Sequence, residues 1–173
     1  MAQLPLFDPA RENALMVRDA RGHYRPATPE QVLTAARAIV DQTVRRETSF
    51  ATPNVAKDYV RAKLSGLEHE VFAALFLTAQ NQLIEYVELF RGTITQSMVY
   101  PREVIKEALA RNAAALIIAH NHPSGRTEPS AADRQLTVQL RDTLALVDVR
   151  LLDHVLVAGN ETVSFQEMGM CSL

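Results

Sequence analysis

The sequence Ala113-Ala-Ala-Leu-Ile-Ile-Ala-His-Asn-His-Pro-Ser-Gly125 joins a short apolar run directly to a polar loop. The run over residues 113–119 has the length and the isoleucines of a buried strand, although its alanines weaken that prediction. The Pro-Ser-Gly that follows favours a turn. Ser130 then favours the start of a long helix that runs to about Leu146. A strand, a loop and a helix in succession are the unit from which α/β folds are built.

Helical and strand-like patterns alternate along the rest of the chain. Thr28-Pro29 has the N-cap and first-turn residues that favour a helix start, and apolar residues follow at helical spacing. Two continuous apolar runs on either side of Asn81 indicate a hairpin of buried strands. The expected fold class is therefore α/β, with a mixed β-sheet flanked by helices. Helices are predicted over residues 29–45, 53–64, 101–111 and 130–146, and strands over residues 70–77, 83–90, 113–119, 149–157 and 162–165.

The chain is expected to hold one domain with an N-terminal extension. Its 173 residues are a typical length for a single domain. Residues 1–28 contain three prolines and no sustained apolar period, which predicts an irregular arm. A helix over residues 29–45 then leads into the main domain, residues 46–173.

The composition is typical of a globular protein with a core, since 47% of the residues are apolar and 22% are charged. The net charge is −2 and the pI is about 6.2, so no whole-chain basic field favours direct nucleic-acid binding. The single cysteine, Cys171, cannot form an internal disulfide. The N-terminus lacks an apolar signal segment, and the apolar runs are too short to span a bilayer. We therefore expect a cytoplasmic protein without membrane contact.

Three potential metal ligands surround the loop after the 113–119 strand. His120 and His122 are two residues apart, so in extended backbone their side chains point to the same side. Asp133 falls in the first turn of the next helix, from which a carboxylate can point back at the strand end. Two nitrogens and one oxygen leave the fourth tetrahedral position of a zinc ion open for water, as catalytic zinc requires.

Each of these residues also has a plain structural interpretation. Two histidines in a turn are often only polar loop residues. Ser130 and Asp133 form an ordinary helix start, in which the serine caps the helix and the aspartate returns a hydrogen bond. The combination of three donors around one loop favours the metal site, and the capping role does not exclude it.

The spacing His120-x-His122-Pro-x6-Ser130-x2-Asp133 resembles the JAMM motif of the MPN/JAB metalloprotease-like domains. Further segments in the same order resemble the bacterial RadC proteins, and together the resemblance covers roughly residues 45–166. The segments are Phe90-Arg-Gly-Thr93, Tyr100-Pro-Arg-Glu-Val-Ile-Lys106, Asn112–Gly125 and Leu151-Leu-Asp-His154.

The resemblance implies a three-layer MPN/JAB core of the cytidine-deaminase-like kind. It also implies one zinc ion per chain, held by His120, His122 and Asp133. A glutamate at the start of the first core strand is the general base in the family, and Glu70 occupies that position here. The family further implies that Ser130 donates a hydrogen bond to the developing oxyanion.

Other residues compete for these roles. Glu68 precedes the strand and is expected to be solvated, while Glu88 falls late in the next strand. His154 is not expected to be a fourth ligand, because a fourth protein ligand would close the site, and a supporting role is more typical of a strand histidine. Asp153 could orient a ligand histidine.

The N-terminal region departs from the usual RadC pattern. RadC proteins usually carry a helix-hairpin-helix-like region before the MPN domain, but only forty-odd residues precede the matching segment here, which indicates a shortened form. Its absence weakens a prediction of direct DNA binding. Gln3-Leu-Pro-Leu-Phe7 resembles the short peptide by which bacterial replication and repair proteins dock on the sliding clamp. The alternative is that Leu6 and Phe7 fold back onto the domain.

Three functions are consistent with these features. The first is a zinc metallopeptidase that cleaves a peptide or isopeptide bond in a peptide or protein substrate. The second is a repair- or replication-associated binding module with little or no catalysis, and the third is a zinc-stabilised scaffold. A scaffold would be expected to have a broken ligand or base position, and here none is broken. The sequence leaves the substrate and the oligomeric state open.

Overall fold

The computed structural model describes residues 15–47, 49–92 and 99–170, and the chain divides into two compact units, Met1–Ile39 and Val40–Leu173. In the first unit, β1 (Met16–Arg18) and β2 (Tyr24–Pro26) form an antiparallel hairpin. Helix α1 (Pro29–Glu47) follows and continues two residues beyond its predicted end.

The prediction of an irregular arm over residues 1–28 is therefore wrong for its described part. The turn of the hairpin is closed by Asp19, whose Oδ1 accepts hydrogen bonds from the backbone N–H groups of Arg21 and His23, both at 2.9 Å. Gly22 has a φ of +88°, which glycine adopts without strain. Three-residue strands are too short to give an apolar period, so the sequence pattern missed them. The clamp-like segment 3–7 and Cys171 lie outside the described residues.

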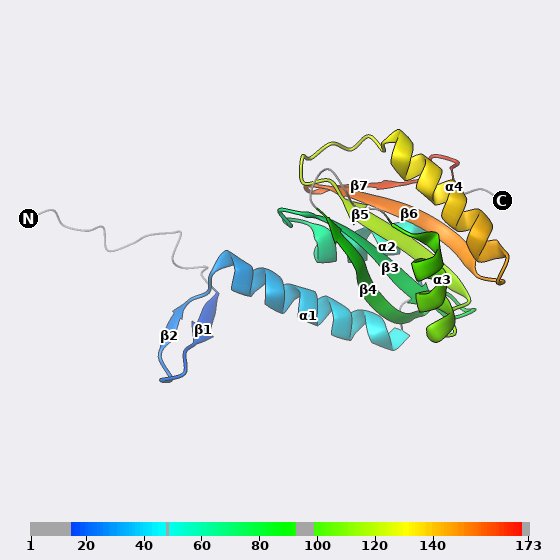
Figure 1. Ribbon diagram of the computed structural model, residues 1–173. Coiled ribbons are helices and arrows are strands. Elements are labelled where there is room, and N and C mark those ends of the chain that lie inside the picture. Colours follow the sequence, from blue (N-terminus) through cyan, green and yellow to red (C-terminus); the bar gives the residue numbers. More distant parts are fainter. Residues whose placement is uncertain (1–14, 48, 93–98, 171–173) are drawn as a thin grey trace, which may run out of the picture. The chain divides into compact units, whose positions relative to one another are not determined.

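The second unit contains a five-stranded mixed sheet in the order β4-β3-β5-β6-β7 (Figure 1). β5 and β6 pair in parallel, and the other neighbours pair antiparallel. Three helices, α2 (Pro53–Leu64), α3 (Pro101–Ala110) and α4 (Ala131–Ala145), pack against it. The strands are β3 (Glu70–Leu77), β4 (Leu83–Gly92), β5 (Ala115–Asn121), β6 (Arg150–Ala158) and β7 (Glu161–Ser164).

Alternate residues of β5 face two separate apolar clusters. Ala115, Ile117 and Ala119 belong to a cluster with α2 residues, whereas Leu116 and Ile118 belong to a cluster with residues of α3 and α4. The sheet is therefore the middle of three layers, and the predicted α/β three-layer fold is confirmed. By the same alternation, residue 120 faces α3 and α4, and residue 121 faces α2.

The bounds of β5 differ from their prediction in a way that matters for the site. The strand begins at Ala115 and ends at Asn121, so His120 lies in the sheet rather than after it. Asn112, with a φ of 51°, turns the chain just before the strand. His120 is consequently held by sheet pairing on both sides, opposite Phe72 of β3 and Leu156 of β6.

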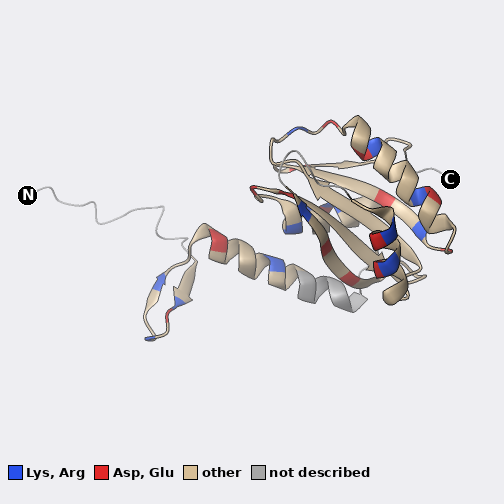
Figure 2. Cartoon of the chain, in the orientation of Figure 1, with Lys and Arg blue, Asp and Glu red and all other residues tan. Residues whose placement is uncertain are grey.

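Charged residues of both signs are interspersed on the helices of the second unit (Figure 2). On α3, Glu103 pairs with Lys106, and on α4, Arg141 pairs with Asp142. Within the described residues, no helix is long and apolar enough to cross a membrane.

Candidate metal centre

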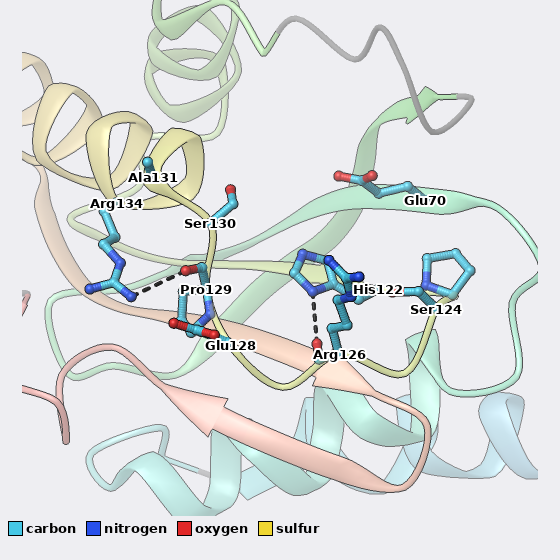
Figure 3. A pocket seen from close by; sticks show the side chains of 10 residues that line it. Glu70, His122, Ser124, Arg126, Glu128, Pro129, Ser130, Ala131 and Arg134 are labelled. Atoms are coloured by element: carbon cyan, nitrogen blue, oxygen red, sulfur yellow. Dashed lines mark hydrogen bonds between the residues drawn. The ribbon is translucent and has the colours of Figure 1, made fainter.

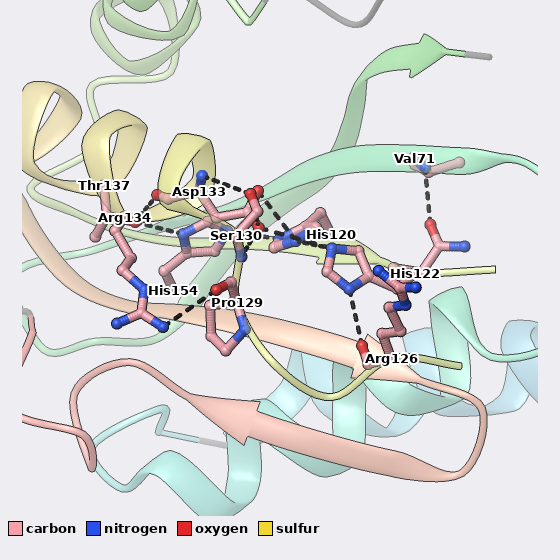
Figure 4. A network of polar contacts seen from close by, with 11 residues as sticks. Val71, His120, His122, Arg126, Pro129, Ser130, Asp133, Arg134, Thr137 and His154 are labelled. Carbon is pink, nitrogen blue, oxygen red and sulfur yellow. Dashed lines mark hydrogen bonds and ion pairs between the residues drawn. The ribbon is translucent and has the colours of Figure 1, made fainter. Parts of the chain in front are cut away.

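Three side chains from two elements and their connecting loop meet at the end of β5 (Figure 4). The Nε2 atoms of His120 and His122 are 3.2 Å apart. Asp133, in the first turn of α4, places Oδ1 3.5 Å from Nε2 of His120 and Oδ2 3.7 Å from Nε2 of His122. One donor atom from each residue lies within 4.8 Å of the others, so the group could hold a metal ion.

The separations of these donors fit a zinc ion. Ligands about 2.0–2.1 Å from a tetrahedral zinc lie about 3.3–3.4 Å from one another. The two ring nitrogens, 3.2 Å apart, are close to that edge length, and each lies 3.5 or 3.7 Å from one of the two Asp133 oxygens. Two imidazole nitrogens and one carboxylate oxygen are also a donor set that zinc prefers, and they leave one tetrahedral position for another ligand.

Asp133 is held in place by the start of its own helix. Its Oδ2 accepts hydrogen bonds from the backbone N–H and the hydroxyl of Ser130, at 2.7 and 2.6 Å, and Oγ of Ser130 accepts from the N–H of Asp133. Burial opposes ionisation of this carboxyl group, but the contacts with His120 and Ser130 outweigh it and hold the pKa of Asp133 well below its usual range. The capping box therefore orients an ionised carboxylate toward the histidines.

The capping contacts bear on the predicted oxyanion role of Ser130. In this structure its hydroxyl donates its only proton to Asp133 Oδ2. A hydrogen bond to an oxyanion would require that proton to be redirected. The oxyanion role of Ser130 stays a prediction, while its role in positioning Asp133 follows from the hydrogen bonds.

His122 is oriented by the loop that follows it. Its Nδ1 lies 2.8 Å from the backbone oxygen of Arg126. A carbonyl oxygen only accepts hydrogen bonds, so Nδ1 carries a proton, and Nε2 is the nitrogen that faces His120 and Asp133 and can present a lone pair to a metal ion. The turn that makes this contact includes Gly125, which has a φ of +75°.

A cavity of about 640 Å³ is lined by His122, one of the three donors, and by the candidate general base. Glu70, at the first position of β3, is half-buried and lines this cavity together with His122 and Ser130 (Figure 3). The competing glutamates lie elsewhere. Glu68 is exposed, and Glu88 forms an ion pair with Arg91 on β4.

The family comparison agrees with the site and the fold. Residues 50–170 match the model of the RadC-like JAB domain. The chain belongs to the RadC-like JAB domain family. It is 59% identical over 136 residues to a UPF0758 protein of Leptothrix cholodnii and 55% identical over 143 residues to one of Vibrio cholerae. These matches cover 79% and 83% of this chain, and 61% and 90% of the two relatives, so the chain spans about three fifths of the Leptothrix protein.

In this RadC-like JAB domain, Asn121, which lies between the two histidines, also supports the site, although the sequence pattern did not indicate it. Asn121 is buried, and its side chain bonds to the backbone on both sides of Glu70. Its Oδ1 accepts from the N–H of Val71 at 2.8 Å, and its Nδ2 donates to the carbonyl of His69 at 3.0 Å. One strand segment thus carries a candidate metal donor at His120 and fixes the peptide groups that flank the candidate base.

We expect replacement of Asn121 by alanine to lower the free energy of unfolding by about 1–3 kcal/mol, because it leaves the buried N–H of Val71 without its partner. Urea unfolding measures the change, with Asn54→Ala on the exposed side of α2 as the control. Equal stability of the two variants would contradict the proposed contact. Zinc binding should be retained, since Asn121 contributes no metal donor.

Asp153 does not orient a ligand histidine, contrary to the sequence-based suggestion. Its carboxylate accepts hydrogen bonds from the hydroxyl of Ser164 and from the backbone N–H groups of His154 and Gln166. It therefore ties β6 to β7 and to the segment that follows. The residue that does contact a ligand ring is its neighbour, His154, whose Nε2 lies 2.8 Å from Nδ1 of His120.

The buried carboxyl group of Asp153 predicts a pH-dependent stability. Burial raises the pKa of Asp153 above its usual value, and the three hydrogen bonds offset this only in part. Between the unfolded and folded pKa values, the folded chain keeps a proton that the unfolded chain has released. The free energy of unfolding therefore falls as pH rises through that window.

Asp153→Asn lacks this titration, and its amide can donate to Ser164 while its oxygen accepts the two N–H bonds. We expect the stability of wild type minus that of Asp153→Asn to decrease over the pH range that begins at about 4, the usual pKa of an aspartate. Urea unfolding across that range measures it. A pH-independent difference would mean that the carboxyl group titrates alike in both states.

Proposed function

We propose that this chain is a zinc-dependent hydrolase of the JAMM type that cleaves a peptide or isopeptide bond. The observation that carries the proposal is the pairing of two features in one place. Two imidazole nitrogens and a carboxylate oxygen are spaced for zinc, and a second carboxylate, Glu70, lines the adjoining cavity. Membership of the RadC-like JAB family supports the same chemistry.

His120, His122 and Asp133 would hold the ion. A zinc ion bound there would lower the pKa of a water molecule and polarise the carbonyl of the scissile bond. Glu70 would accept the proton of the attacking water and return it to the leaving amine, which is the usual work of a carboxylate in this position. Ser130 orients the Asp133 carboxylate through its hydrogen bonds to Oδ2.

The cavity lining supports a polar, peptide-like substrate. Arg126 and Arg134 lie around it together with the carboxylates Glu70 and Glu128 (Figure 3). Peptide groups offer both donors and acceptors to such a lining, and an apolar small molecule would leave these charges without partners. Specificity for one peptide or isopeptide sequence would arise from these side chains.

Incubation of the zinc-loaded protein with a peptide library and with lysine-linked isopeptides in ¹⁸O-labelled water tests the proposal. Mass spectrometry should find new carboxyl termini that carry ¹⁸O, lost after chelation and restored by zinc. An absence of cleavage of both classes by protein that holds one zinc per chain would refute it. Docking of segment 3–7 on a sliding clamp stays a separate prediction, because that segment lies outside the described residues.

A further inference from the structure

A buried histidine lies directly behind one of the candidate metal ligands. His154 of β6 is 0% exposed, and its Nε2 lies 2.8 Å from Nδ1 of His120. Its other nitrogen, Nδ1, lies 2.6 Å from the hydroxyl of Thr137 on α4 (Figure 4). Both nitrogens of His154 are therefore engaged with protein groups on the far side of His120 from the proposed metal.

The protons in this chain of contacts can be assigned from the hydroxyl group. Thr137 has one hydroxyl proton and donates it to the backbone oxygen of Asp133 at 2.6 Å. Its oxygen must then accept from Nδ1 of His154. The ring of His154 lies among aromatic side chains, with its centroid 4.3 Å from that of Phe165 and 6.0 Å from that of Phe72. Such burial favours a neutral ring with one proton.

Because the one ring proton of His154 is on Nδ1, the tautomer of the candidate metal ligand His120 is also fixed. Nε2 of His154 has no proton, so it must accept a hydrogen bond from Nδ1–H of His120. In the metal-binding form of His120, which carries only this proton, Nε2 is left with a lone pair, and it is the atom that lies 3.2 Å from Nε2 of His122. In that form, the lone pairs of His120 and His122 point into the same space beside Asp133, where a bound metal ion would accept both.

The same contacts also connect two of the donors to each other. Thr137 lies one helical turn after Asp133 and is bonded to its backbone, while His154 reaches from Thr137 to His120. Movement of α4 relative to β5 would therefore break this series of hydrogen bonds.

We propose that Thr137 and His154 are positioning residues that fix the metal-binding tautomer of His120 and hold it in register with Asp133. The inference rests on the proposed metal site but not on any hydrolytic activity. Hydrogen-bond partners of ligand histidines elsewhere contribute about 10–100-fold to metal affinity. His154 is accordingly a support for the site rather than a fourth ligand.

Thr137→Val removes the hydroxyl and keeps the shape of the side chain. We expect it to weaken zinc binding, measured by competition with a chromogenic chelator, by about 10–100-fold. Thr137→Ser restores the hydroxyl and should bind within about threefold of wild type. The matched control is Thr143→Val, because Thr143 on the same helix makes the same bond to the backbone four residues earlier, at 2.7 Å to Gln139.

Thermal unfolding of the metal-free variants shows whether a loss of zinc affinity comes from a changed tautomer of His120 or from a destabilised fold. Equal zinc affinities of Thr137→Val and Thr143→Val would overturn the proposal. A loss of zinc affinity in Thr137→Val but not in Thr143→Val, without any peptide cleavage by wild type, would support the positioning role while refuting the hydrolase function. Normal peptide cleavage by wild type, together with equal zinc affinities of Thr137→Val and Thr143→Val, would support the hydrolase function and overturn the positioning role.

Long-range ¹H–¹⁵N spectra of histidine-labelled protein give a second, direct readout. The proposal predicts protons on Nδ1 of both His120 and His154 in the zinc-loaded protein, and loss of the His154 Nδ1–H signal by exchange in Thr137→Val. A proton on Nε2 of His154 would overturn it.

Discussion

Replacement of His122 by alanine is expected to abolish stoichiometric zinc binding. The change removes one of the three residues whose donor atoms lie within 4.8 Å of one another, and it leaves only His120 and Asp133. Loss of a supporting hydrogen bond alone costs about 10–100-fold in metal affinity, so loss of a ligand should exceed about 100-fold. Equilibrium dialysis followed by metal analysis measures both the affinity and the number of ions per chain.

The appropriate control for this variant is another histidine outside the cluster. His69 is exposed, and its backbone oxygen rather than its ring accepts the hydrogen bond from Asn121. His69→Ala should keep one zinc per chain. If His122→Ala also kept one zinc at wild-type affinity, the ion would lie elsewhere and the assignment of the ligands would be wrong.

Replacement of Glu70 by glutamine should separate binding from chemistry. The amide keeps the size of the side chain but cannot take a proton from water, so we expect kcat to fall by about 10²–10⁴-fold. Zinc content should not change, because Glu70 is not among the three grouped donors. Rates of peptide cleavage and metal content are measured on the same preparations.

Glu68→Gln is the matched control for Glu70→Gln. It removes the same charge two residues earlier, from an exposed side chain, and should leave the rate within about twofold of wild type, as expected of a screened surface charge. Equal rates for Glu70→Gln and wild type would eliminate Glu70 as the base. The outcome also bears on a purely binding role, which would tolerate Glu70→Gln in any cellular assay.

The parts of the fold that could be predicted are those in which one local pattern decides the structure. The apolar run before His120 predicts a buried strand, and the structure contains β5 there. Ser130 and Asp133 predict a helix start, and they form the capping box of α4. The hairpin of the first unit was not predicted because no apolar periodicity marks its strands. Its turn is instead stabilised by hydrogen bonds to the side chain of Asp19.

The supporting residues of the site could not be predicted for a different reason. Asn121 acts on Glu70 across two neighbouring strands, about fifty residues apart in sequence. His154 reaches His120 only because β6 pairs with β5 in parallel and places position 154 on the α4 face. The partner of each side chain depends on strand order, which one sequence does not reveal.

A zinc-edge anomalous difference map from crystals of the zinc-loaded protein tests the central claim most directly. We expect one peak per chain, about 2.0–2.2 Å from Nε2 of His120, Nε2 of His122 and a carboxylate oxygen of Asp133. The fourth position should be open toward the cavity that Glu70 lines. A map without a peak among these three residues, or with His154 as a fourth protein ligand, would contradict it.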